Sequence, residues 1–217
     1  MTWYAGYILT SPEKTIIDDL STIPNIDKNL YKIRDLNNFK WFDKKVKHDL
    51  SDEGLLVCRE VFNKESTDEA EYYNDEFIST DKFVGPENYE VLKPQMVKDI
   101  LKDEIDVDHF EEVCPPINFL RFLKWLNRNN KKVISYYYCA TWGGDTEMEF
   151  SWTFEDSEEI IFLYKDDVNT LKLNKSKEKT IINDAVLKLT LLQHKITLPS
   201  NYFALCSRSF DWNQYRL

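Results

Sequence analysis

The chain has 217 residues, with 28 lysines and arginines against 38 aspartates and glutamates, which gives a formal net charge of −10 at pH 7. This charge repels phosphate backbones and anionic lipids, which argues against nucleic acid or a membrane surface as a direct partner. The four cysteines (Cys58, Cys114, Cys139, Cys206) form no Cys-x-x-Cys pair, and no apolar run approaches the roughly 20 residues that span a bilayer. We therefore expect a cytoplasmic protein with free thiols, folded as one globular domain over residues 1–217.

The N-terminal third is predicted to be mostly sheet. Aromatic and β-branched residues over 3–9 predict a first strand. Ser11 and Pro12 then suit the cap and the first position of a short helix. Its apolar side would be formed by Ile16, Ile17 and Leu20. Further strands are predicted over 30–36, 39–46 and 55–62.

Two acidic stretches are predicted to face solvent. Six acids and no base lie between Glu65 and Glu76, a pattern typical of a solvated, mobile loop. Six more acids lie between Asp103 and Glu112. Because they lack the glycine and the ligand order of a calcium-binding loop, we interpret them as a solvated helix end or connection.

Three helices are predicted in the rest of the chain. One begins at Pro94, a stronger one follows Pro115-Pro116, and a third covers 180–193. The second carries a wide apolar stripe made of Phe119, Leu120, Phe122, Leu123, Trp125 and Leu126. The basic residues at its end, which are Lys124, Arg128, Lys131 and Lys132, complement the helix dipole without any ligand. The aromatic tail over 196–217 is expected to fasten the chain end to the core.

The most informative stretch is a hairpin over 133–154. Two runs rich in β-formers flank Gly143-Gly144, and Gly-Gly between such runs is typical of a tight hairpin turn. A two-residue loop pairs Trp142 with Asp145, and counting outward assigns each side chain to a face. The face predicted to be core consists of Val133, Ser135, Tyr137, Cys139, Thr141, Thr146, Met148, Phe150, Trp152 and Phe154.

The opposite hairpin face combines aromatic rings with a row of carboxylates. Its candidate partner-binding residues are Tyr136, Tyr138, Trp142, Asp145, Glu147 and Glu149. Rings with polar tips are favoured at protein interfaces, and the carboxylates would select a cationic partner. Two other interpretations remain open. The face can be an ordinary half-exposed sheet surface, or a second helical layer can cover it with tyrosine hydroxyls bonded to carboxylates.

Motifs for catalysis or cofactor binding are absent from the sequence. His48, His109 and His194 lie far apart with no second ligand at metal spacing. Alternate carboxylates on one strand are about 7 Å apart, too far to chelate one ion. The sequence has no Gly-x-Ser-x-Gly and no phosphate-binding glycine loop. We therefore expect no catalytic residue, no metal and no cofactor.

The fold is predicted to be α+β, with a largely antiparallel sheet around a central Gly-Gly hairpin and helices packed mainly on one face. In acidity, low glycine content and lack of catalytic motifs the chain resembles bacterial immunity proteins that neutralise polymorphic toxins. The local focus is residues 142–147 (Trp-Gly-Gly-Asp-Thr-Glu), and no family motif is matched. The resemblance implies a module that binds a basic toxin.

Two other functions remain open from the sequence. One is a small-ligand binder or hydrolase-like enzyme with a carboxylate and tyrosine pocket, in which Glu147 or Glu149 acts as general base. The other is a scaffold subunit that associates with itself through an apolar patch. The sequence does not indicate the oligomeric state.

Overall fold

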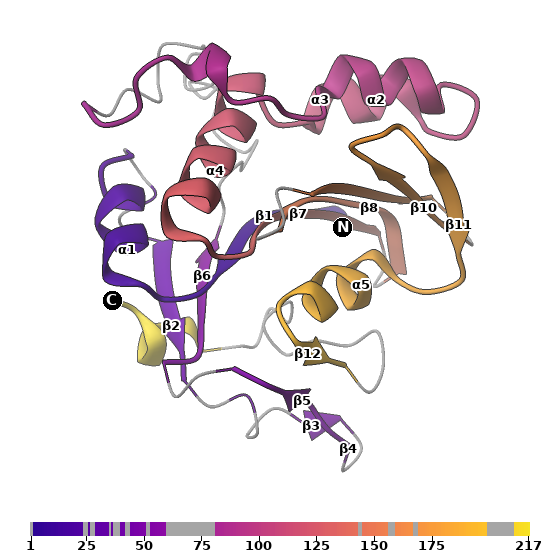
Figure 1. The fold of residues 1–217 in the computed structure, drawn as a ribbon. Coiled ribbons are helices and arrows are strands. Elements are labelled where there is room, and N and C mark those ends of the chain that lie inside the picture. The colour runs from indigo at the N-terminus through magenta and orange to yellow at the C-terminus, as the bar shows by residue number, and fades with distance from the viewer. Residues whose placement is uncertain are drawn as a thin grey trace.

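The structure is a computed structural model. It describes residues 2–23, 26, 29–34, 36, 40–41, 44–50, 53–59, 81–142, 145–155, 159–166, 169–198 and 211–217. An eight-stranded sheet forms its centre, and every pair of neighbouring strands is antiparallel (Figure 1). The strands in sheet order are β11 (Lys179–Ile182), β10 (Asn169–Asn174), β9 (Ile160–Asp166), β8 (Asp145–Phe154), β7 (Ile134–Trp142), β1 (Thr2–Thr10), β6 (Leu55–Arg59) and β2 (Leu30–Ile33).

The topology is simple because β7 to β11 follow one another both in sequence and in space. The chain enters the sheet at β1, which pairs with β7 on one side and β6 on the other. Two small ribbons lie outside the main sheet. One pairs β12 (Ile196–Thr197) with β5 (Lys47–His48), and the other pairs β3 (Lys40–Trp41) with β4 (Lys44–Lys45).

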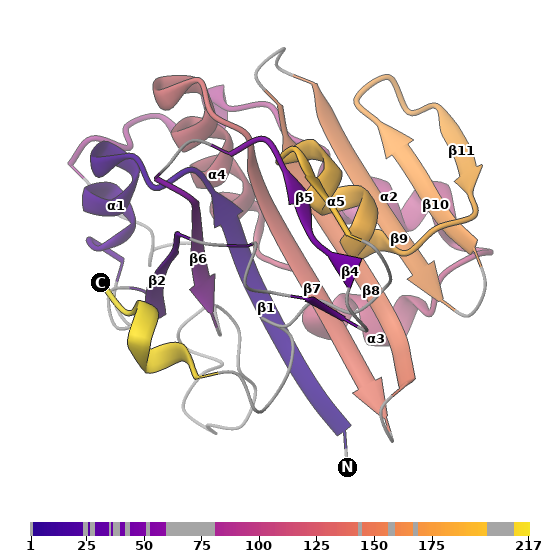
Figure 2. The ribbon, with the colours of Figure 1, turned by 90° about the horizontal axis from the view of Figure 1, so that it is seen from below.

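Four helices cover one face of the sheet and a fifth covers the other (Figures 1 and 2). The first group comprises α1 (Lys14–Leu20), α2 (Pro94–Leu101), α3 (Val107–Val113) and α4 (Ile117–Asn130). On the opposite face lies α5 (Val186–Gln193). The predicted α+β class, antiparallel sheet and mainly one-sided helices are confirmed. Among the described helices, none is long and apolar enough to cross a membrane.

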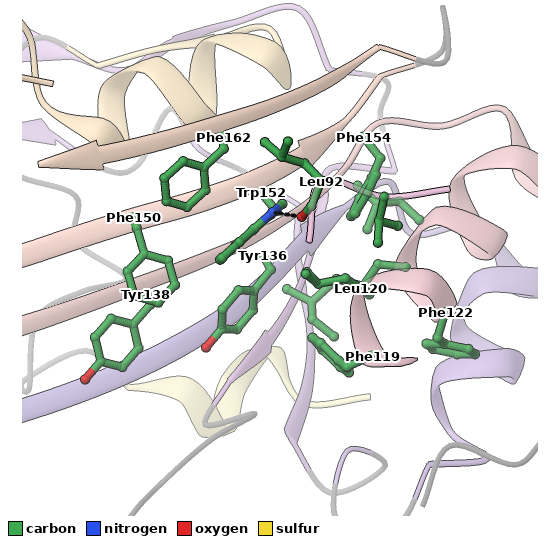
Figure 3. Packing of buried hydrophobic residues seen from close by; sticks show 14 of the residues in the cluster. Leu92, Phe119, Leu120, Phe122, Tyr136, Tyr138, Phe150, Trp152, Phe154 and Phe162 are labelled. Atoms are coloured by element: carbon green, nitrogen blue, oxygen red, sulfur yellow. Dashed lines mark hydrogen bonds between the residues drawn. The ribbon is translucent and has the colours of Figure 1, made fainter. Parts of the chain in front are cut away.

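An aromatic cluster fills the space between the sheet and the helical group (Figure 3). Phe110 of α3 lies with its ring centroid 5.5 to 6.2 Å from four sheet rings, those of Phe150, Trp152, Phe162 and Tyr164. The indole N–H of Trp152 donates to the carbonyl of Leu92 at 2.9 Å. This bond gives the buried indole a partner and fixes the segment before α2 against the sheet.

The helix predictions hold for the two strongest patterns, and at two weaker ones the helix begins later than predicted. α2 begins at Pro94, and α4 buries its predicted apolar stripe. α1 begins at Lys14 with Glu13 as its N-cap, so Ser11 and Pro12 precede the helix. The predicted helix over 180–193 was wrong in its first part, because residues 180–182 belong to β11. There Thr180, Ile181 and Ile182 pair with β10, as β-branched residues favour.

The end of the chain is fastened to the core, as predicted for the tail. Within the short 3₁₀ helix η6 (Trp212–Tyr215), Trp212 packs edge-on against Tyr31 at 4.7 Å between ring centroids. The guanidinium of Arg59 lies 4.5 Å from the Trp212 ring. The acidic stretch at 65–76, which was predicted to be a mobile loop, lies outside the described residues. So do the aromatic residues at 202, 203 and 210.

Candidate functional site

A β-bulge decides which hairpin side chains share a face. The predicted pairing of Trp142 with Asp145 is confirmed, but the register shifts between Ala140 and Thr141. Thr141 pairs with Thr146 and Ala140 pairs with Met148, so Glu147 is the extra residue of the bulge. A one-residue shift moves every following side chain to the other face. The two faces assigned from the sequence are therefore wrong beyond the bulge.

The predicted surface tyrosines are part of the core. Tyr138 pairs with Phe150 and stacks on it at 4.9 Å between ring centroids, and Tyr136 pairs with Trp152. Tyr136 is fully buried and Tyr138 is 2% exposed, both under the helical group (Figure 3). Phe150 and Trp152 do belong to the core, but they share it with these tyrosines and not with Tyr137.

Glu149 lies on the opposite face and is also buried, at 4% exposure. Its carboxylate accepts the backbone N–H groups of Val186 and Leu187 at 3.0 and 3.1 Å and the hydroxyl of Tyr137 at 3.0 Å. Burial raises the pKa of the Glu149 carboxyl, and the two N–H groups and the hydroxyl act in the lowering direction. The side chain thus caps the first turn of α5 from a neighbouring strand.

The remaining predicted residues stay near the hairpin end. Trp142 and Asp145 pair through their backbones, and their side chains lie outside the described part of the structure. Glu147 is exposed. The structure therefore does not bring the six predicted residues together on one surface, and of their described side chains only Glu147 is available to a partner.

A different acidic surface is prominent on the helical side. We call it the acidic ridge, and its seven exposed carboxylates are Asp99, Asp103, Glu104, Asp106, Asp108, Glu111 and Glu112. It is built on α2, α3 and their connection (Figure 1). The predicted solvent exposure of 103–112 is confirmed, but the stretch also contains α3. Phe110 anchors that helix in the aromatic cluster, while Asp106 caps it through the N–H of His109 at 3.1 Å.

Part of the ridge is neutralised by the chain itself. Lys98 pairs with Glu111, and Lys179 of β11 pairs with Glu104. Asp103 and Asp108 form no ion pair within the described residues. These two carboxylates keep their charge available to a partner.

A cleft lies where α4 and α5 end, and its cavity volume is about 270 Å³. We call it the basic cleft, because three of its lining residues are lysines. Its lining is Thr10, Ser11, Asp49, Leu50, Gly54, Leu55, Lys131, Lys132, Val133, Gln193, His194 and Lys195. Gly54 has φ 83°, and a Cβ there would lie 2.1 Å from the Ile33 carbonyl oxygen, so this wall admits only glycine. No predicted site residue lines the cleft.

One wall of the cleft carries a buried serine–histidine pair. His194 Nε2 lies 2.8 Å from Ser135 Oγ, which lies 2.8 Å from Thr153 Oγ1. Burial lowers the pKa of His194 to about 4, so the imidazole is neutral at physiological pH. Ser135 is fully buried, and a nucleophile needs access to its substrate. The pair is therefore a positioning arrangement and not a nucleophile with its base.

The described cysteines and acids offer no further reactive centre. Burial raises the pKa of Cys139 to about 12 and that of Cys114 to about 11, which keeps both thiols protonated and weakly nucleophilic. Cys58 is buried as well. Within the described part of the chain, no three histidines, cysteines or acids gather as a metal site would require.

Comparison with known proteins gives no relative: no family model, no curated protein and no solved structure matches the chain.

Proposed function

We propose that this protein is a binding module for a basic protein partner, and that it acts as an inhibitor in the manner of immunity proteins. The observation that carries the proposal is the acidic ridge, where seven exposed carboxylates occur within residues 99–112 against one lysine, Lys102. The overall charge of −10 adds a long-range field of the same sign.

The packing beneath the acidic ridge favours binding of a basic protein. Phe110 is buried at 1% exposure and Leu101 is fully buried, so the ridge stands on a packed base. A rigid array of charges binds with little loss of conformational entropy. It also speeds encounter with an oppositely charged protein, and it selects against acidic competitors. Glu147 on the hairpin is a further exposed acid outside the ridge.

Among the described residues, the carboxylates and tyrosines of the alternative pocket do not line the basic cleft. Glu149 and Tyr137 do bond to each other, but they are buried under α5 and fully engaged by it. Glu147 lies outside the basic cleft. The cleft is lined by three lysines, whereas the predicted pocket would be lined by carboxylates and tyrosines.

The test is a titration of the partner after its capture by the wild-type protein from a lysate. The ridge variant carries Asp103→Lys and Asp108→Lys, and the matched control carries Asp18→Lys on α1 and Glu87→Lys on η4 (Pro86–Asn88). Both variants change the charge equally, but only the first changes the ridge. We expect the ridge variant to bind about tenfold or more weakly, mostly through slower association, and its salt dependence to fall.

Circular dichroism and the melting temperature check that both variants are folded. Equal weakening in the ridge variant and the control would reduce the effect to net charge and contradict a specific surface. Capture of no basic protein, or unchanged affinity of a folded ridge variant, would also contradict the proposal. Reversal of Glu149 is unsuitable here, because its carboxylate is needed to cap α5.

A further inference from the structure

The basic cleft is lined by three lysines, although the protein as a whole carries a net charge of −10. Lys131 follows the last residue of α4, and Lys195 follows the end of α5 by two residues, so two helix ends bring their lysines to one opening. The third lysine, Lys132, pairs with Glu13 at 3.0 Å. Lys131 and Lys195 are exposed and form no ion pair with any described residue. Asp49, also exposed, is the one carboxylate that lines the cleft.

Backbone conformation marks the same two lysines. Lys131 has φ 51° and Lys195 has φ 59°, both in the left-handed region. Glycine is the usual residue at such positions after a helix, and another residue costs about 1 kcal/mol or more there. A lysine one turn earlier would complement the helix dipole equally well without this penalty. Among the described residues other than glycine, the third with a positive φ is Lys177, which lies outside the cleft.

His194 lines the cleft and is 6% exposed. Its Nε2 is held by Ser135, whose hydroxyl is in turn held by Thr153. When Thr153 donates to Ser135 and Ser135 donates to Nε2, the proton of the neutral ring lies on Nδ1. Nδ1 then has a hydrogen to offer, and among the described residues it has no hydrogen-bond partner.

We propose that the basic cleft binds the phosphoryl group of a small phosphate ester, with Lys131 and Lys195 as its cations. Ammonium groups recognise phosphate as point charges, whereas planar carboxylates are matched best by arginine, and no arginine lines the cleft. A volume of about 270 Å³ holds a phosphoryl group with a small organic residue and excludes a nucleic acid strand. His194 lines the same cleft, and in the tautomer that carries its proton on Nδ1 it has a hydrogen-bond donor to offer.

Glycine substitution gives an unusually clean test. Lys131→Gly with Lys195→Gly removes both cations and relieves both left-handed lysines, so the fold is expected to gain stability while binding is lost. Lys177→Gly is the control for the left-handed conformation, because Lys177 has φ 67° in the turn before β11 and does not line the cleft. It removes one positive charge, whereas the double variant removes two. Loss of binding in the double variant then cannot be attributed to unfolding.

The probes are inorganic phosphate and phenyl phosphate, added at constant ionic strength with chloride and followed through amide shifts in two-dimensional NMR. We expect saturable shifts at Gly54, Lys131, Val133 and Lys195, with phenyl phosphate binding more tightly than inorganic phosphate. The double variant should bind at least about tenfold more weakly, and Lys177→Gly should bind as the wild type does.

Three results would overturn the proposal. They are shifts that do not saturate in the wild type, shifts centred away from the cleft, and unchanged affinity in the folded double variant. The experiment needs no protein partner, so a negative result would not contradict the proposed binding of a basic protein at the acidic ridge. A negative result at the ridge would likewise not contradict phosphoryl binding in the cleft.

Discussion

Both faces of the β7–β8 hairpin are buried, but one is covered through aromatic contacts and the other through hydrogen bonds. Toward the helical group the strands present Tyr138, Phe150 and Trp152, and the contacts are mostly between rings. Toward α5 the same strands present Ser135, Glu149, Ser151 and Thr153, all at 4% exposure or less. These polar groups find partners in α5, in the residues beside it and in one another.

The helical group is held to the sheet mainly by packing of aromatic rings, whereas α5 is held mainly by buried hydrogen bonds. Ring packing depends on volume and tolerates a small shift, whereas a buried carboxylate with three donors tolerates no loss of a partner. α5 is only eight residues long, and no side chain of its own caps its N-terminus. Short helices are unstable alone, so α5 relies on the cap that Glu149 supplies.

The largest effect is expected on the aromatic face. Trp152→Ala should lower the free energy of unfolding by about 4 kcal/mol, because it leaves a cavity and removes the bond to the Leu92 carbonyl. Trp152→Phe should lose about half of that, since a ring still fills most of the space. Urea unfolding measures both values. Equal losses in the two variants would show that the hydrogen bond, and not the ring volume, carries the contribution.

The next largest effect is expected at the cap of α5. Glu149→Ala should lower the free energy of unfolding by about 3 kcal/mol, because two backbone N–H groups and the Tyr137 hydroxyl lose their acceptor. Glu147→Ala is the control, since Glu147 lies two residues away on the same strand and is exposed. Hydrogen exchange of the Val186 and Leu187 amides should accelerate in the first variant only. A small loss in Glu149→Ala, similar to that of the control, would disprove the cap.

The sequence predicted the hairpin and its turn but not the site, and one residue explains the difference. Gly143-Gly144 is a local signal, and it placed Trp142 opposite Asp145 correctly. The bulge at Glu147 depends on tertiary packing, because only the helical layers decide which register buries Phe150 and Trp152 on the tyrosine side. The continuous pairing opposed Phe150 and Trp152 to Tyr137 and Ser135, and that mismatch was the available signal for a bulge.

The basic cleft could not be predicted from the sequence, because it also depends on tertiary structure. Lys131 and Lys195 are 64 positions apart in the chain, and a sequence pattern does not report that two helix ends meet. The basic end of α4 was predicted, but Lys124 turns out to be buried beside Asn127 and Phe154. Positive φ at a lysine has no signal in the sequence either, because glycine or asparagine is the residue that normally marks it.

The smallest of the three effects is a pH dependence on the polar face. His194 has a folded-state pKa of about 4 against 6.5 in the unfolded chain, because burial opposes its charged form. Its contribution to stability is therefore present above pH 6.5 and is lost as the pH falls toward 4. Between pH 7 and pH 5 the loss should be about 2 kcal/mol. The charged groups that share the cleft with His194 are Lys131, Lys132, Lys195 and Asp49.

Glu149 acts in the opposite direction and has to be separated from His194. Its folded-state pKa is raised, so its contribution is present below its unfolded pKa and is lost as the pH rises through the folded value. Unfolding curves of the wild type and of His194→Gln at pH 5, 6 and 7 isolate the histidine, since Glu149 is common to both. The difference between the two proteins should shrink by about 2 kcal/mol from pH 7 to pH 5. A difference that stays constant with pH would mean that His194 titrates normally, and hence that the Ser135–His194 pair opens to water in solution.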